Sequence, residues 1–75
     1  MAVKQLDTKG LACPLPVLKA RRAMKDMAAG DVLEIEATDP GSVKDFEHFC
    51  ETTGHRLLEA NATGGIFSYR IEKTG

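Results

Sequence analysis

Apolar and polar residues follow a succession of distinct patterns along the chain. Residues 3–7 form a short, weakly alternating stretch that predicts a first strand, and the loop after it turns at Gly10. Residues 13–28 have helical spacing, with proline in the first turn, where it is tolerated, and Gly30 in the place of a helix-ending glycine. The residues that share one face of this helix, and that we expect to contact the core, are Val17, Ala20, Met24, Met27 and Ala28.

The middle of the chain predicts a second strand and a second helix. Residues 31–37 alternate, with Glu34 and Glu36 on one face, which indicates that this side of the sheet is wet. The helix after it is expected to begin at Asp39-Pro40, as N-cap and first helical residue, and to end at Gly54. The residues predicted to face the core from these two elements are Leu33, Ile35, Ala37, Val43, Phe46, Phe49, Cys50 and Thr53.

The end of the chain predicts a hairpin. Residues 55–63 and 66–73 form a third and a fourth strand, joined by a turn at Gly64-Gly65. The fourth strand alternates clearly, so its two faces can be assigned. One face carries Phe67, Tyr69 and Ile71, and the other carries Ser68, Arg70 and Glu72.

The predicted order of elements, β-α-β-α-β-β, indicates the fold. Right-handed crossovers, together with strands that are apolar on a single side, favour helices on one face of the sheet. We therefore expect an α/β fold of the α+β type, a two-layer sandwich with two helices on one face of a four-stranded mixed sheet. We expect residues 1–75 to form one domain, whose small core leaves no room for a deep internal pocket. Chemistry should therefore lie at the surface, with a partner supplying the rest of the active site.

Composition and charge argue against several classes of function. Apolar residues make up 43% of the chain and charged residues 28%, which is typical of a soluble globular domain. The net charge of −1, with both signs mixed, provides no basic field for nucleic acid. No apolar run is long enough to cross a membrane, and the chain start lacks the apolar region of a signal peptide, so we expect a cytoplasmic protein with reduced thiols.

The most informative residue is Cys13, where a loop enters the first predicted helix. The unpaired N–H groups of a helix start carry about half a positive charge, which favours a thiolate and can lower a cysteine pKa from ~8.5 to roughly 3.5–7.5. Pro14 and Pro16 lack N–H groups, so we expect them mainly to stiffen the turn, and the pKa of Cys13 to fall moderately. The competing interpretation is that Cys13 is a small buried hydrophobe, the commoner state of a free cysteine.

The other candidate side chains have structural interpretations. Cys50 lies on the apolar face of the second helix and is predicted to fill the core. His48 lies on the polar side of that helix and His55 follows its end, so a direct catalytic role for either is the minor alternative. A metal set drawn from Cys13 and these three residues matches no zinc spacing, and we expect neither a metal nor a cofactor.

An apolar patch with positive charge is predicted beside the reactive cysteine. Leu15 and Leu18 fall on the side of the first helix that faces away from its core stripe, and Lys19, Arg22 and Lys25 lie on or near the same side. This combination suits docking to an acidic protein partner. In an equally weighted alternative, Leu18 packs against the preceding loop and the cations form a solvated face.

Short segments along nearly the whole chain form a recognisable set. They are Leu6-Asp7, Gly10-Leu11, Cys13-Pro14-Leu15-Pro16-Val17-Leu18, Gly30-Asp31, Thr38-Asp39-Pro40-Gly41-Ser42-Val43-Lys44-Asp45, Phe49-Cys50 and Gly54-His55. A C-P-x-P motif alone is a modest signal, but with the other segments in register the sequence specifically resembles the TusA-like, or SirA-like, family of sulfur-carrier proteins. The resemblance implies the same two-layer β-α-β-α-β-β fold. It also implies that Cys13 is the sulfur-accepting cysteine and that Pro14 and Pro16 shape its loop.

The family resemblance also implies a role in sulfur trafficking. Members accept persulfide sulfur from a cysteine desulfurase or a rhodanese-type donor and pass it to thiol acceptors such as DsrE-like proteins. The downstream uses include tRNA thiolation, molybdenum cofactor maturation and oxidation of reduced sulfur, and the resemblance does not choose among them. We therefore expect a sulfurtransferase of the persulfide-relay kind, a monomer that forms transient complexes, with no stable nucleic-acid or membrane binding.

Two other functions remain open at this point. The protein could be a non-catalytic interaction or regulatory module, in which the first-helix surface binds a partner and Cys13 is incidental. It could also be a thiol redox sensor that pairs Cys13 with Cys50. That second possibility requires Cys50 to leave the core, because cysteines whose Cα atoms are more than about 7 Å apart cannot be bridged without backbone movement.

Overall fold

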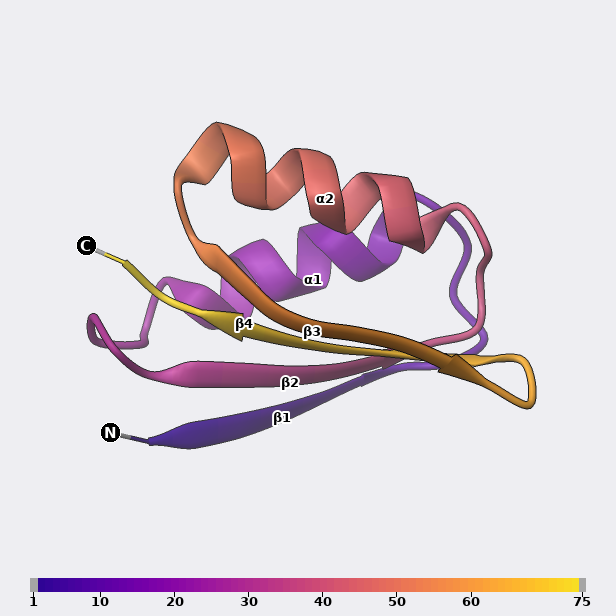
Figure 1. Cartoon of the computed structure of the whole chain (residues 1–75), viewed down its shortest axis with the longest axis horizontal. Coiled ribbons are helices and arrows are strands. Elements are labelled where there is room, and N and C mark those ends of the chain that lie inside the picture. The colour runs from indigo at the N-terminus through magenta and orange to yellow at the C-terminus, as the bar shows by residue number, and fades with distance from the viewer. Residues whose placement is uncertain (1, 75) are drawn as a thin grey trace.

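The elements follow one another in the predicted order, β-α-β-α-β-β. The computed structural model describes residues 2–74. The bounds of its elements are β1 Val3–Thr8, α1 Leu15–Met24, β2 Val32–Ala37, α2 Ser42–Thr53, β3 Arg56–Thr63 and β4 Ile66–Glu72. Strands and helices form two layers, with both helices over the same face of the sheet (Figure 1).

The four strands form one mixed sheet in the order β1-β2-β4-β3. β1 and β2 are parallel, and β4 runs antiparallel to both β2 and β3. The α1 crossover therefore joins neighbouring parallel strands, while the α2 crossover carries the chain to the far edge and leaves the central position to β4. Gly64 and Gly65, both with positive φ, form the turn of the β3–β4 hairpin. The predicted two-layer α+β sandwich is confirmed.

The core lies between the helices and the inner face of the sheet. Leu33, Ile35 and Ala37 of β2 are almost completely buried, as their alternation predicts. Tyr69 of β4 packs on Phe46 of α2, with 4.6 Å between the ring centroids. Full burial of a large apolar side chain stabilises a fold by about 1.5–3 kcal/mol, so this layer holds the helices onto the sheet. The other buried residues of the cluster are Ala20, Met24, Met27, Phe49, Cys50 and Ile71.

The helix ends differ from the predicted ones. α1 ends at Met24, and the ammonium of Lys73 donates hydrogen bonds to the carbonyls of Met24 (2.7 Å) and Met27 (2.6 Å), which lie at and just beyond the helix end and need partners outside the helix. Met27 still packs in the core, but Ala28 is exposed. Thr53, in the last turn of α2, is exposed as well. The predictions that Ala28 and Thr53 face the core are therefore wrong.

Two of the three predicted capping residues also have other roles. Gly30 does not end α1 but lies in the turn before β2, with φ of +94°. α2 begins at Ser42 after Gly41, so the prediction of Asp39-Pro40 as N-cap and first helical residue is wrong. Gly54 ends α2 as predicted, in the left-handed conformation (φ of +81°) that glycine adopts without a steric penalty.

The outer face of the sheet is polar, as the alternation of β2 and β4 predicts. Arg70 of β4 lies between two acids, with nitrogen–oxygen distances of 3.3 Å to Glu34 and 3.5 Å to Glu59. Cys13 does not lie on this face, because it follows β1 in the loop at the end of the sheet. Among residues 2–74, no helix is both long enough and apolar enough to span a membrane.

Candidate functional site

Cys13 lies in the loop between β1 and α1, at the end of the sheet where the parallel strands β1 and β2 both terminate (Figure 1). Its side chain is exposed, so the interpretation of Cys13 as a buried hydrophobe is wrong. α1 begins at Leu15, with Pro14 as the residue before it and Pro16 in its first turn. The thiol therefore stands just outside the helix.

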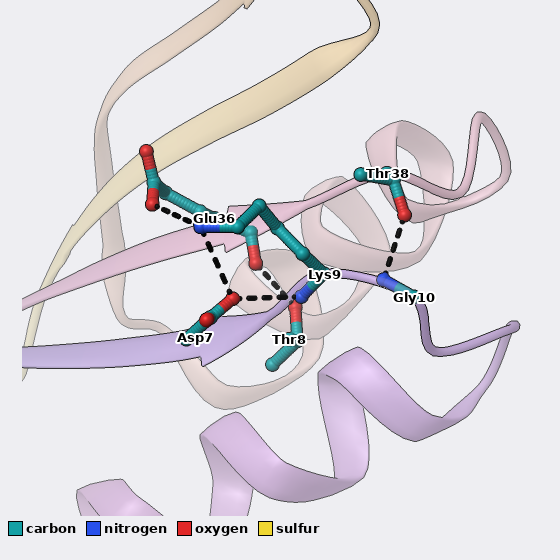
Figure 2. A network of polar contacts seen from close by, with 6 residues as sticks. All are labelled: Asp7, Thr8, Lys9, Gly10, Glu36 and Thr38. Atoms are coloured by element: carbon teal, nitrogen blue, oxygen red, sulfur yellow. Dashed lines mark hydrogen bonds and ion pairs between the residues drawn. The ribbon is translucent and has the colours of Figure 1, made fainter.

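Polar contacts attach the loop before Cys13 to the end of β2 (Figure 2). The hydroxyl of Thr8, which is fully buried, donates to the carbonyl of Glu36 at 2.6 Å. The backbone N–H of Gly10 donates to the hydroxyl of Thr38 at 2.8 Å. The ammonium of Lys9 pairs with the Glu36 carboxylate at 3.0 Å, although an exposed pair of this kind contributes little. These contacts fix the direction in which the chain approaches the cysteine.

Asp39 holds the backbone of the cysteine itself. The N–H of Cys13 donates to Oδ2 of Asp39, in the loop between β2 and α2, at 3.0 Å. This contact explains why Asp39 is not the cap of α2, since its carboxylate binds an N–H group of the neighbouring loop. Gly41 allows the close approach: a Cβ at this position would lie 3.1 Å from Oδ2 of Asp39 and 3.7 Å from Cβ of Cys13.

A second carboxylate contacts the thiol directly. Sγ of Cys13 donates a hydrogen bond to Oδ2 of Asp45, in the first turn of α2. Cys13 is therefore bound at two points, through its N–H to Asp39 and through its thiol to Asp45. Both acceptors come from the segment that begins α2, so the loop after β1 and the start of α2 build the site together.

These carboxylates reverse the predicted electrostatics of the thiol. The hydrogen bond to Asp45 raises the pKa of Cys13 above its ordinary value, with further contributions from burial and from the negative charges of Asp45 and Asp39. The prediction of a lowered pKa is wrong. Pro14 and Pro16 provide no N–H groups, and the N–H of Leu15 is occupied by the carbonyl of Ala12 at 2.9 Å. The helix start therefore offers the sulfur few donors, while two acceptors lie beside it.

A buried hydrogen bond anchors the start of α2 to the sheet. The hydroxyls of Ser42 and Tyr69 lie 2.7 Å apart, and both residues are almost completely buried. Burial raises the pKa of Tyr69, the hydrogen bond with Ser42 opposes this, and the charges of Glu47, Asp39 and Asp45 add to the increase. Ser42 is the first residue of α2, so this contact sets the position of the turn that carries Asp45.

The other candidate residues lie apart from this arrangement. Cys50 is buried in the core, as predicted, and burial raises its pKa to about 11. His55 packs on Phe49, with 5.8 Å between the ring centroids, and its Nδ1 accepts the N–H of Thr74 at 3.2 Å. His48 is exposed on α2. In the part of the chain that the structure describes, no group of three or more His, Cys, Asp or Glu side chains is placed to hold a metal ion.

The predicted apolar patch forms a shallow groove next to the cysteine loop. Leu15 and Leu18 are 44% and 50% exposed, so Leu18 is not packed away against the loop. The groove, of about 540 Å³, lies between α1 and β1, and Lys19 and Arg22 lie along it. Its other lining residues are Lys4, Leu6, Ala23 and Asp26.

Sequence reasoning missed both carboxylates of the site. The sequence pattern predicts Asp39 as a helix cap and indicates no role for Asp45. One signal was available: a strand-helix-strand crossover usually joins parallel strands, and the loops that leave the same ends of parallel strands lie side by side. An acid in the loop after β2 was therefore a candidate neighbour for a cysteine in the loop after β1.

Known proteins resemble this chain over nearly its whole length. Residues 4–73 match the family described as Sulfurtransferase TusA. The chain is 48% identical over 71 residues to the sulfur carrier protein TusA of Allochromatium vinosum, covering 95% of this chain and 93% of that protein. It is 47% identical over 72 residues to a putative sulfur carrier protein of Neisseria meningitidis serogroup A, covering 96% and 97% respectively.

A solved structure agrees in fold. The crystal structure of a SirA-like protein from Desulfitobacterium hafniense superposes with a TM-score of 0.81 and covers 100% of both chains, at 23% identity. The superposition supports the architecture, and the two sequence relatives support the family. The site at Cys13 therefore stands in a chain that belongs to the TusA family.

Proposed function

We propose that this protein is a sulfur carrier that accepts sulfane sulfur on Cys13 as a persulfide and relays it to a protein acceptor. The observation that carries the proposal is an exposed, free thiol on a loop that is held by backbone hydrogen bonds at Gly10 and at Cys13 itself, in a chain whose other cysteine is buried. Relatives named as sulfur carriers support it.

The proposed reaction is a pair of sulfur transfers between thiols. The sulfur of Cys13 attacks the outer sulfur of a donor persulfide, and a new S–S bond forms as the donor S–S bond breaks. The electron pair of the broken bond and the proton of the Cys13 thiol are left with the donor cysteine, so Cys13-SH and donor-S-SH become Cys13-S-SH and donor-SH. An acceptor thiolate then attacks the outer sulfur of Cys13-S-SH in the same way.

The size of the domain favours transfer within a complex. Cys13 stands on a surface loop, so the partner must cover the reacting sulfur during transfer. The groove beside it, with Leu15 and Leu18 exposed and Lys19 and Arg22 along it, suits an acidic partner surface with an apolar centre. Pro14 and Pro16 shape the loop between the groove and the thiol.

The partners of such a carrier are proposed by class. The donor is a cysteine desulfurase or a rhodanese-type protein, and the acceptor is a DsrE-like or other thiol protein. The pathway is one of tRNA thiolation, molybdenum cofactor maturation and sulfur oxidation. We further propose a cytoplasmic monomer that forms transient complexes and requires no cofactor.

One observation favours a second candidate, a non-catalytic interaction module. The raised pKa of Cys13 reduces the thiolate fraction at neutral pH, which is the opposite of what an isolated nucleophile requires. In that case the groove residues bind the partner and the thiol is incidental.

The test is intact-protein mass spectrometry after incubation with a cysteine desulfurase and cysteine. We expect a gain of one sulfur atom, removed by reductant, in the wild type and in Cys50→Ser, and no gain in Cys13→Ser. Absence of the gain from all three proteins, with a rhodanese-type donor also tried, would favour the interaction module.

A further inference from the structure

We propose that Asp45 accepts the proton of the Cys13 thiol when the sulfur attacks a donor persulfide, and that Asp39 positions the cysteine for this transfer. The inference rests on the proposed function and adds two residues to it. Asp45 touches the reacting sulfur, whereas Asp39 acts through the backbone of Cys13.

The geometry supports these two roles. The thiol of Cys13 donates to Oδ2 of Asp45, so the proton already lies along the path to the carboxylate. The 3.0 Å contact from the N–H of Cys13 to Asp39 prevents the loop from carrying the sulfur away from α2. Neither acid forms an ion pair with a Lys, Arg or His among residues 2–74, so no cation draws either carboxylate away from Cys13.

The groups around Cys13 identify Asp45 as the base. The first residues of α1, Leu15 to Leu18, carry no charge. From the sheet, Tyr69 of β4 is the nearby titratable group, and its hydroxyl is engaged with Ser42. On α2, Lys44 precedes Asp45, and Glu47 and His48 follow it, but the thiol hydrogen-bonds to Asp45. His48 is the residue that an experiment must separate from Asp45, because it lies one turn further along α2 and an imidazole can also accept a proton.

A proton acceptor resolves the conflict between a raised thiol pKa and a nucleophilic role. The thiol stays protonated at rest, which limits its oxidation, since oxidation follows thiolate character. Thiols of higher pKa are intrinsically better nucleophiles once the proton leaves. During attack the proton passes to Asp45 while the sulfur forms its new S–S bond, and Asp45 returns a proton to the departing donor thiolate. No oxidant or reductant is consumed.

A purely structural role for Asp45 makes a different prediction. An acid in the first turn of a helix also stabilises the helix dipole, and such a role would not couple it to the reactivity of the thiol. If Asp45 accepts the proton, the reactive species is the Cys13 thiol and the Asp45 carboxylate sharing one proton. This pair reacts without first forming the free thiolate, so its rate does not follow the thiolate fraction as the pH changes. Without it, reactivity follows the free thiolate and falls about tenfold per pH unit below the thiol pKa.

The test measures alkylation of Cys13 by iodoacetamide between pH 5.5 and 7.5 on the full chain. Trypsin releases residues 10–19, which contain Cys13, separately from Cys50, so peptide mass spectrometry follows Cys13 alone. We expect the wild-type rate to change less than about threefold across this range, and the rate of Asp45→Asn to fall roughly 100-fold from pH 7.5 to 5.5. Glu51→Gln, with the same charge change further along α2, and His48→Asn should keep the wild-type profile.

Three outcomes would overturn the assignment of Asp45: a steep wild-type profile, a flat profile that persists in Asp45→Asn, or loss of the flat profile in Glu51→Gln or His48→Asn. Circular dichroism of each variant shows whether the fold is retained. Asp39→Ala, which removes the acceptor of the Cys13 N–H, should keep the flat profile but react more slowly throughout, and unchanged rates in that variant would overturn the positioning role. The alkylation experiment uses no sulfur donor, so a negative result would reject the role of Asp45 without rejecting the carrier function, which sulfur uptake tests separately.

Discussion

Removing the Tyr69 hydroxyl tests whether the start of α2 is held to the sheet by a buried hydrogen bond. In Tyr69→Phe the ring keeps its packing on Phe46, but the Ser42 hydroxyl loses its partner inside the core. A buried polar group left without a partner costs about 1–3 kcal/mol. One kcal/mol shifts the Tm of a domain of this size by about 4–8 °C, so a loss of about 2 kcal/mol lowers the Tm by roughly 8–16 °C.

The assay is a double-mutant cycle followed by urea and thermal unfolding. Ser42→Ala should destabilise the fold by a similar amount, because it leaves the hydroxyl of Tyr69 without its hydrogen-bond partner. The double variant removes both partners, so it should cost less than the sum of the single variants by about 1 kcal/mol or more. Additive effects, or a Tyr69→Phe change below about 0.5 kcal/mol, would refute the claim that this contact anchors α2.

Three further predictions concern other parts of the molecule. Leu18→Asp and Arg22→Glu should each change the free energy of unfolding by less than about 0.5 kcal/mol but slow sulfur transfer from a protein donor at least about tenfold. Lys44→Glu on α2 is the matched control, and equal slowing in that variant would contradict the role of the groove as a docking surface. Cys50→Ser should destabilise the fold by about 1–3 kcal/mol, measured by urea unfolding, while sulfur uptake stays intact, because the substitution buries a hydroxyl in an apolar site. Burial lowers the pKa of His55 in the folded state, so the stability that this residue contributes above its unfolded pKa is lost as the pH falls from about 7 to 5. His55→Asn should flatten this decline in the free energy of unfolding, and an unchanged slope against pH in that variant would contradict the prediction.

Much of the fold followed from periodicity, because the core residues alternate in β2 and β4 and recur with helical spacing in α2. Leu33, Ile35 and Phe46 are buried where the pattern places them. The errors lie at helix ends, where a contact distant in sequence competes with the local preference. At the end of α1, for example, Lys73 from the far end of the chain binds the carbonyls of Met24 and Met27, a contact that the local pattern does not contain.

The candidate site was predictable only in part. Cys13 was identifiable because a cysteine before proline at a helix start has a local signature. The direction of its pKa shift was not, because Asp39 and Asp45 come from a segment more than 25 residues away, with separations of 26 and 32 positions. Local reasoning assigned the helix charge to the thiol, whereas the tertiary structure places two acids there, and a direct hydrogen bond to a carboxylate outweighs the partial charge of a helix end whose prolines lack N–H groups.

The central claim is that Cys13 both receives and releases sulfane sulfur. The most direct measurement is a pulse and chase. The protein is loaded with isotopically labelled sulfur from a desulfurase, separated from the donor, and then mixed with a small-molecule or protein thiol acceptor. Mass spectrometry of the peptide of residues 10–19 follows the label on Cys13. We expect the label to appear on Cys13, at one sulfur atom per chain, and then to pass to the acceptor thiol. Label that never reaches Cys13, or that stays there in the presence of acceptor thiol, would contradict it.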